Sequence, residues 1–361
     1  MQRRDFLRHS AQLSAAGAAA VTGLRMSRAE KPRPDRIRVG QIGTAHAHAA
    51  GKMETLRKFP DLFEVVGLVE PDAALRERLS AHKVYRDVPL LAEEQLLAAP
   101  GLQAVAVETE VRDLVPTARR CAAAGVHIHL DKPAGESLDD LRSLLDEATA
   151  HKRIVQMGYM LRYNPGFDFA FNAVKQGWLG DVFEVHGVMS KQLDDATRRE
   201  LAEYPGGTMF ELGCHLIDPL VYLLGPPDAV RPFSRKSRPE QDGLADNQLA
   251  VFEYKQATAT IRSAVIEPHG GQRRQFTICG TQGVIDMHPI EPPRLRLALE
   301  KPRDGFRAGY QDVQLPALGG RYDGDFIDLA AVIRGEKEFA FTPAHDLAAH
   351  EAILRASGVM A

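Results

Sequence analysis

Three polar residues in the middle of the chain have a spacing that suits acid–base chemistry. Glu211, His215 and Asp218 occupy positions i, i+4 and i+7, which places their side chains on one face of a predicted helix. Histidine titrates near neutral pH and readily exchanges a proton with a hydroxyl group. We therefore predict that His215 is the general acid or base and that Glu211 orients it.

Both residues also have structural interpretations. The string from Thr208 to Glu211 has the pattern of a capping box, in which the glutamate bonds back to the N-terminus of its own helix. His215 could be a hydrogen-bonded histidine in an apolar helix, with Cys214 beside it in the core. The sequence leaves these alternatives open.

A lysine follows an apolar stretch that is typical of a buried strand. Lys132 comes after 126–130 and Asp131, and Pro133 fixes the direction in which the chain continues. An ammonium group at a strand end can stabilise the alkoxide that forms when a hydroxyl is oxidised. We predict this role for Lys132; the alternative is a solvated lysine paired with Asp131.

Two pairs of histidines have the alternating spacing of candidate metal ligands. They are His46 with His48, and His127 with His129 on one face of a predicted strand. Neither pair has a carboxylate or cysteine partner that the sequence identifies. We therefore predict no metal site.

The elements that must position these residues alternate between strands and helices up to residue 160. Such alternation indicates a parallel sheet with helices on both faces, with ligands bound beyond the carboxyl ends of the strands. The predicted strands are 37–42, 64–69, 104–107, 126–130 and 153–159. One predicted helix follows the first strand and ends at Phe59, and two others cover 111–124 and 137–150.

After Pro165 the pattern changes to several strands with few helices between them. We predict an α/β protein with an N-terminal Rossmann-type parallel-sheet domain at 37–160. A C-terminal α+β domain with an open, mainly antiparallel sheet follows at 161–361, and its final helices can pack back on the first domain. The predicted strands are 182–188, 248–254, 259–266, 274–280 and 294–299, with helices at 167–176, after 207, at 324–334 and at 343–356.

The first predicted strand ends in a glycine turn that matches part of the dinucleotide fingerprint G-x-G-x-x-G. Gly43 occupies its first position, whereas Ala45 and His48 replace the later glycines. Glu70 ends the second strand, where a carboxylate binds the ribose hydroxyls of NAD and repels the 2′-phosphate of NADP. We therefore predict NAD as the cofactor. The predicted cofactor-binding residues are Gly43, Thr44, Ala45, His46, Glu70, Thr109, Asp131 and Lys132.

The first 29 residues have the features of an export signal. Arg3 and Arg4 precede an Ala-rich stretch at 11–21 that is too short to span a bilayer, and 27–29 offer a cleavage site. This string resembles a twin-arginine (Tat) signal, which exports folded proteins. We predict a signal peptide at 1–29, a linker at 30–36 and a periplasmic protein without membrane attachment after cleavage; the alternative is a basic tail.

The overall charge excludes one large class of partner. The 361 residues include 45 Lys+Arg and 48 Asp+Glu, a formal net charge of −3, and no basic run compensates. Nucleic acid is therefore not an expected partner. The three cysteines lie far apart and match neither a disulfide framework nor a zinc motif.

Several motifs together resemble the Gfo/Idh/MocA oxidoreductase family over nearly the whole chain after residue 29. The resemblance implies a Rossmann domain, a second domain with an open antiparallel sheet, and oxidoreduction of sugars or cyclitols by a bound nicotinamide. The resemblance implies that Lys132 matches the lysine of the family's E-K-P motif. It further implies that Glu211 matches the aspartate of the family's catalytic helix and that His215 matches its catalytic histidine. The motifs are the turn at Gly43, the acid Glu70, 131–133, 162–165, 177–180 and 206–218.

The crossover into the second domain supplies further candidates. Arg162, Tyr163 and Asn164 are predicted substrate contacts together with Asp218, and a plain hinge is the equal alternative. Glu211 departs from the family's aspartate by one methylene group.

We therefore expect an exported enzyme that oxidises a hydroxyl of a sugar, glycoside or cyclitol. The periplasm supplies no exchanging NAD pool, so the NAD(H) would be recycled in place and the net reaction would be redox-neutral. A homodimer or homotetramer through the C-terminal sheet is expected. Two other functions stay open: a metal-assisted lyase or hydratase that uses His46 and His48, and a non-catalytic sugar-binding relative.

Overall fold

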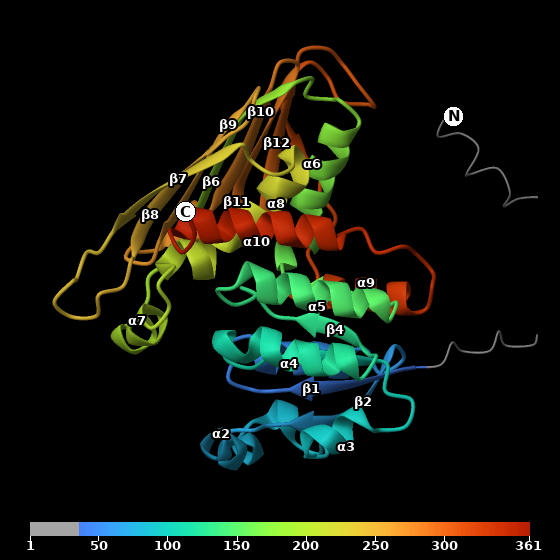
Figure 1. Ribbon diagram of the computed structural model, residues 1–361. Coiled ribbons are helices and arrows are strands. Elements are labelled where there is room, and N and C mark those ends of the chain that lie inside the picture. Colours follow the sequence, from blue (N-terminus) through green and yellow to red (C-terminus); the bar gives the residue numbers. More distant parts are fainter. Residues whose placement is uncertain (1–35) are drawn as a thin grey trace, which may run out of the picture. The chain divides into compact units, whose positions relative to one another are not determined.

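The first half of the protein is built on a five-stranded parallel sheet in the order β2-β1-β3-β4-β5 (Figure 1). The structure, a computed structural model, describes residues 36–361. The predicted export signal and all but the last residue of the predicted linker lie outside the described residues. The strands are β1 (Ile37–Ile42), β2 (Phe63–Val69), β3 (Ala104–Val107), β4 (His127–Leu130) and β5 (Val155–Met157).

Helices cover both faces of this sheet, and its central strand β3 is therefore buried along its whole length. The predicted Rossmann-type fold is confirmed. The prediction missed the short helices α2 and α3, whose five or six residues carry little periodic pattern. The helices are α1 (Ala49–Lys58), α2 (Ala73–Arg78), α3 (Glu93–Leu97), α4 (Val111–Ala123) and α5 (Leu138–Ala150).

An eight-stranded sheet follows, in the order β13-β12-β11-β10-β6-β9-β8-β7. Every neighbouring pair is antiparallel except β6 and β9, so the predicted open, mainly antiparallel sheet is confirmed. The prediction missed β7, β11 and β13. The strands are β6 (Val182–Ser190), β7 (Ala229–Arg235), β8 (Asn247–Glu253), β9 (Thr258–Ala264), β10 (Gln275–Gly280), β11 (Gly283–Ile290), β12 (Pro293–Leu299) and β13 (Gly309–Val313).

The helices of the second half of the chain pack against both sheets. The helix α9 packs on the parallel sheet, where Phe326 meets Phe63 edge to face at 5.9 Å. The helices α8 and α10 share a core with the eight-stranded sheet (Figure 1). These helices are α6 (Pro165–Lys175), α7 (Asp195–Ala202), α8 (Cys214–Leu224), α9 (Asp323–Ile333) and α10 (Pro343–Ser357).

One face of the large sheet carries polar pairs between neighbouring strands. His186 Nδ1 lies 2.8 Å from the Thr260 hydroxyl, and the Thr277 hydroxyl donates to Asp286 at 3.2 Å. Assembly of copies through this sheet stays a prediction. Within residues 36–361, no helix is long and apolar enough to cross a membrane.

Candidate active site

Lys132 stands at the carboxyl end of β4 and reaches across to the second domain. Its side chain is 1% exposed, and its Nζ donates to the backbone oxygen of Glu211 at 2.7 Å and to Oε1 of the same residue at 3.3 Å. Burial lowers the pKa of Lys132, but the Glu211 carboxylate and other nearby negative charges outweigh burial and raise it above its usual range. Because an ammonium group has three N–H donors, a charged donor remains for a ligand.

Glu211 is not a helix cap. Glu211 lies in a π-helical turn (Met209–Gly213). Thr208 makes no side-chain cap to this turn, because the Thr208 hydroxyl pairs with the Ser263 hydroxyl at 2.8 Å. The Glu211 carboxylate instead pairs with Lys132 and, at 3.5 Å, with Lys191. Burial raises the pKa of Glu211, but the two lysines outweigh burial and lower the pKa to about 2. Glu211 therefore orients Lys132, whereas the sequence analysis assigned it to His215.

His215 begins the second turn of the same helical segment, at the start of α8. Its ring is 3% exposed, lies edge to face with Tyr159 at 6.4 Å, and has an Nδ1 atom that is buried without a hydrogen-bond partner. Burial, together with the charges of Lys132 and His48, holds the pKa of His215 well below its usual range. The imidazole is therefore neutral near pH 7 and is able to accept a proton.

The structure separates Asp218 from this group. The Arg162 guanidinium donates to Asp218 and to Asp346, both at 2.6 Å, and His345 Nε2 lies 3.0 Å from Asp218. The buried Arg162 therefore connects the crossover segment to Asp218 in α8 and to Asp346 in α10. His215 and Asp218 both lie in α8, whereas the π-helical turn interrupts the regular helical spacing between Glu211 and these two residues.

The other two crossover residues also have structural partners. The Tyr163 hydroxyl donates to Asp328 at 3.0 Å. Asn164 caps α6 by accepting from Gly166 at 2.8 Å and donates to the Ile290 carbonyl at 3.0 Å. These contacts favour the hinge interpretation of 162–164. Arg162 and Tyr163 line a cavity of about 800 Å³, but Lys132, Glu211 and His215 do not.

The turn after β1 has the form that a dinucleotide needs. Gly43 has φ +89°, and a Cβ there would lie 2.7 Å from the Thr109 nitrogen, so no other residue fits without strain. The helix α1 begins after His48 with no side-chain cap and no acidic residue in its first turn. The N–H of Ala49 donates to the His46 backbone oxygen at 3.0 Å, whereas the next two N–H groups, those of Ala50 and Gly51, remain for an anion such as a pyrophosphate. Thr44 is half-buried and Ala45 is exposed beside them.

Glu70 lies where the ribose of a dinucleotide would bind. It is 3% exposed at the end of β2, where its carboxylate accepts from the Thr44 hydroxyl and from the Asp72 N–H at 2.9 Å. A carboxylate has further lone pairs for a ribose diol. Arg76, which the sequence analysis did not consider, donates to the Glu70 backbone oxygen at 3.0 Å. The residues around Gly43 and Glu70 thus fit an NAD-type cofactor.

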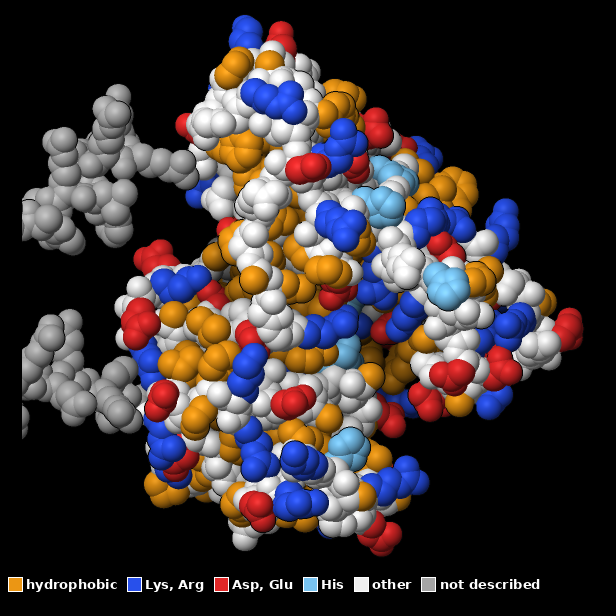
Figure 2. Space-filling model, turned by 180° about the vertical axis from the view of Figure 1, so that it is seen from behind, with side chains coloured by type: hydrophobic (Ala, Val, Ile, Leu, Met, Phe, Trp, Pro, Cys, Tyr) orange, Lys and Arg blue, Asp and Glu red, His pale blue; other side chains and the backbone are white. Residues whose placement is uncertain are grey.

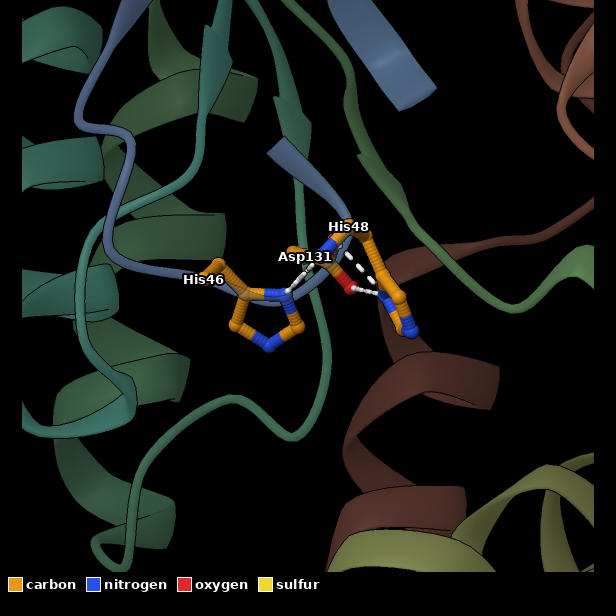
Figure 3. Close-up of side chains that lie close together, drawn as sticks. All are labelled: His46, His48 and Asp131. Atoms are coloured by element: carbon orange, nitrogen blue, oxygen red, sulfur yellow. Dashed lines mark hydrogen bonds and ion pairs between the residues drawn. The ribbon is translucent and has the colours of Figure 1, made fainter. Parts of the chain in front are cut away.

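Two histidines meet Asp131, the residue that precedes Lys132 (Figure 3). His46 Nδ1 lies 3.2 Å and His48 Nδ1 lies 3.1 Å from Asp131 Oδ2. The Lys132 backbone N–H donates to Asp131 Oδ1 at 2.7 Å. Asp131 is 0% exposed, and it connects the β1–α1 turn to Lys132.

Sequence reasoning missed Lys191. Lys191 directly follows β6 of the mainly antiparallel sheet, where a strand-end position does not mark a ligand site as it does in a parallel sheet. Glu108 follows β3 and is 0% exposed, with both carboxylate oxygens lacking a hydrogen-bond partner. Seen from behind, the surface is hollowed between the parallel-sheet part and the large sheet, with Lys and Arg side chains around the hollow (Figure 2).

The fold and this site define a two-domain oxidoreductase with a nucleotide-binding Rossmann domain. The model of the oxidoreductase family with an NAD-binding Rossmann fold matches residues 37–159, and that of the GFO/IDH/MocA C-terminal domain matches residues 168–286. The two matches cover well over half of the chain. The chain therefore belongs to the Gfo/Idh/MocA oxidoreductase family.

Individual relatives are distant. An uncharacterised oxidoreductase of Rhizobium meliloti, ORF334, is 30% identical over 184 residues, which are 51% of this chain and 54% of that protein. The chain thus spans about half the length of this relative. The inositol 2-dehydrogenase of Agrobacterium fabrum is 26% identical over 308 residues, covering 82% of this chain and 86% of that protein.

A solved structure shares the fold over nearly the full length. The aldose-aldose oxidoreductase of Caulobacter crescentus, complexed with glycerol, superposes with a TM-score of 0.75 at 19% identity. The similarity covers 90% of this chain and 98% of that chain. At this identity the likeness concerns the fold.

Proposed function

We propose that this protein is an NAD-dependent oxidoreductase that acts on a CH–OH group of a sugar, glycoside or cyclitol. The observation that carries the proposal is the pairing of Lys132 with Glu211 beside the neutral base His215. The names of relatives that act on inositols and aldoses support the substrate class.

The bound nicotinamide would accept or return the hydride. The free N–H of Lys132 would donate to the substrate oxygen and stabilise its developing negative charge. His215 would accept the hydroxyl proton, because its lowered pKa keeps the ring neutral. Glu211 would keep the ammonium charged and hold it in place through the backbone and carboxylate contacts.

We further propose that the cofactor is NAD rather than NADP and that it stays bound between turnovers. The buried carboxylate of Glu70 supports the first part, because a 2′-phosphate beside it would meet a second negative charge. The second part rests on the proposed export, since a recycled cofactor makes the net reaction redox-neutral. A change in reduced-nicotinamide absorbance when substrate is added to purified protein, without added nucleotide, tests the second part, and the mass of the released nucleotide tests the first.

The proposed export predicts a processing defect when the arginine pair is changed. The double variant Arg3→Lys, Arg4→Lys should accumulate as an uncleaved precursor inside the cell, because the Tat route depends on the paired arginines. Wild-type protein should mature to a form that begins near Glu30. Fractionation and N-terminal sequencing measure both results, with Arg8→Lys as the matched control outside the pair. Unimpeded processing of the double variant would contradict the Tat assignment.

A further inference from the structure

Two rings and one carboxylate from distant parts of the chain converge at the end of β4. Figure 3 shows His46 and His48 on either side of Asp131, with a ring nitrogen of each turned toward the carboxylate. His48 Nδ1 lies 3.1 Å from both carboxylate oxygens, and His46 Nδ1 lies 3.2 Å from Oδ2. The donor atoms of the three residues all lie within 4.8 Å of one another.

The hydrogen bonds of His46 show which of its nitrogens carries the proton. Its Nε2 lies 3.1 Å from the backbone oxygen of Lys132, which can only accept, so Nε2 is the N–H. Its Nδ1 accepts the backbone N–H of His48 at 3.3 Å. A metal ion bound at Nδ1 would take the place of this long contact with the His48 N–H, 3.2 Å from the carboxylate oxygen of Asp131. A cation bound between the two groups would stabilise their close approach.

These distances suit a metal ion. Ligand atoms about 2.1 Å from one ion and separated by 90–110° lie about 3.0–3.4 Å apart, which matches the contacts of both rings with Asp131. A histidine that binds a metal usually donates its other N–H to a carbonyl or carboxylate, as His46 does to the Lys132 carbonyl.

The surroundings of the group hold buried carboxylates without enough partners. Both carboxylate oxygens of Glu108 are buried without a hydrogen-bond partner. The nearby ammonium of Lys52 donates to Asp325 at 3.1 Å and lies 2.7 Å from His129. An additional positive charge beside Asp131 would stabilise this buried group of acids.

We propose that His46, His48 and Asp131 bind one divalent first-row transition-metal ion of the zinc class. Two imidazoles and one carboxylate leave at least one coordination position for water or a substrate oxygen. The ion would fix the β1–α1 turn to the end of β4, one residue from Lys132. This site goes beyond the proposed oxidoreductase function and does not depend on it.

A second cluster of potential ligands serves as an internal contrast. Asp218, His345 and Asp346 also place ligand atoms within 4.8 Å of one another. The guanidinium of Arg162 already contacts both aspartates at 2.6 Å, so this cluster has its cation. We therefore expect a single ion per chain.

Zinc binding to the full chain tests the proposal. Protein freed of metal by a chelator should take up one equivalent of Zn²⁺, measured by elemental analysis and by titration calorimetry without nucleotide or substrate. The double variant His46→Ala, His48→Ala should bind Zn²⁺ about 100-fold more weakly or worse, since even outer contacts of a metal site contribute 10- to 100-fold. The variants His82→Ala and His345→Ala should bind as the wild type does.

A second measurement covers the case in which the double variant fails to fold. His48→Gln keeps a polar side chain of similar size, and visible absorbance of added Co²⁺ reports the ligand geometry directly. The wild type should show intense tetrahedral-type Co²⁺ bands, and His48→Gln should weaken or shift them. Wild-type protein that binds no Zn²⁺, or variants at His46 and His48 that bind it unchanged, would overturn the proposal. Because no redox step is involved, a failed oxidoreductase assay leaves this result interpretable.

Discussion

His215→Ala is expected to lower the rate of hydride transfer by about 10²–10⁴, the usual contribution of a general base. The ring is buried beside Lys132 and neutral, so its removal leaves the substrate proton without an acceptor. Binding of the nucleotide should be retained, because His215 lies outside the Gly43 turn and the end of β2. Single-turnover absorbance of the reduced nicotinamide and nucleotide titration measure the two effects separately.

A matched control distinguishes chemistry from loss of a buried ring. His350 in α10 is 1% exposed and, like His215, is held neutral because burial lowers its pKa to about 4. His350→Ala should lower stability without a comparable loss of hydride transfer in the folded fraction. Equal rates for His215→Ala and the wild type would show that the site is misplaced.

The pH profile of the wild type gives a second readout of the same base. Burial, then the charges of Lys132 and His48 and of Arg321 and Arg274, lower the pKa of His215 well below its ordinary value of 6.5. The neutral form therefore persists into acid, and kcat/KM should not fall as the pH is lowered through 6.5. An acid limb centred at or above 6.5 would contradict this assignment.

Lys132→Met is the second substitution with a large expected effect. It keeps an unbranched side chain only one atom shorter but removes the charged donor, and loss of one such donor to a developing oxyanion costs about 10²–10³ in kcat. The pKa of Glu211, now held at about 2, should rise because its largest favourable interaction is with Lys132. Steady-state kinetics and the acid titration of the variant measure these changes.

Lys191→Met is the matched control for this substitution. Lys191 contacts the same carboxylate at 3.5 Å but lies on its other oxygen, with its side chain 30% exposed. Its loss should affect kcat far less than the loss of Lys132, and a small alkylammonium ion should partly restore Lys132→Ala. Equal effects of the two methionine variants, or full activity of Lys132→Met, would show that Lys132 only packs.

The sequence was most informative where the signal is local. Strands alternating with helices predicted the parallel sheet, and a strand-end position was enough to single out Lys132. Lys191 follows a strand of the mainly antiparallel sheet, so no comparable signal marks it. Short helices such as α2 and the edge strands β7 and β13 were missed, because a few residues with mixed burial carry no clear period.

The partners of the site residues could not be predicted, because they depend on the tertiary fold. Asp131 meets His48 across 83 residues of chain, and Arg162 meets Asp218 across 56. The i, i+4 spacing of Glu211 and His215 predicts a shared face only in a regular α-helix. Glu211 lies in a π-helical turn, and its carboxylate contacts Lys132 instead. Only the folded chain shows these pairings.

The central claim is that the protein oxidises a CH–OH group with an NAD that it retains. The most direct measurement adds inositols, aldoses and glycosides to purified, dialysed protein without added nucleotide and follows absorbance of the reduced nicotinamide, with mass identification of the released nucleotide. We expect a rapid, substoichiometric to stoichiometric rise in absorbance with one of these substrates, its absence in His215→Ala, and a mass of NAD(H). Release of NADP, or protein that turns over substrate without any nucleotide, would contradict the account.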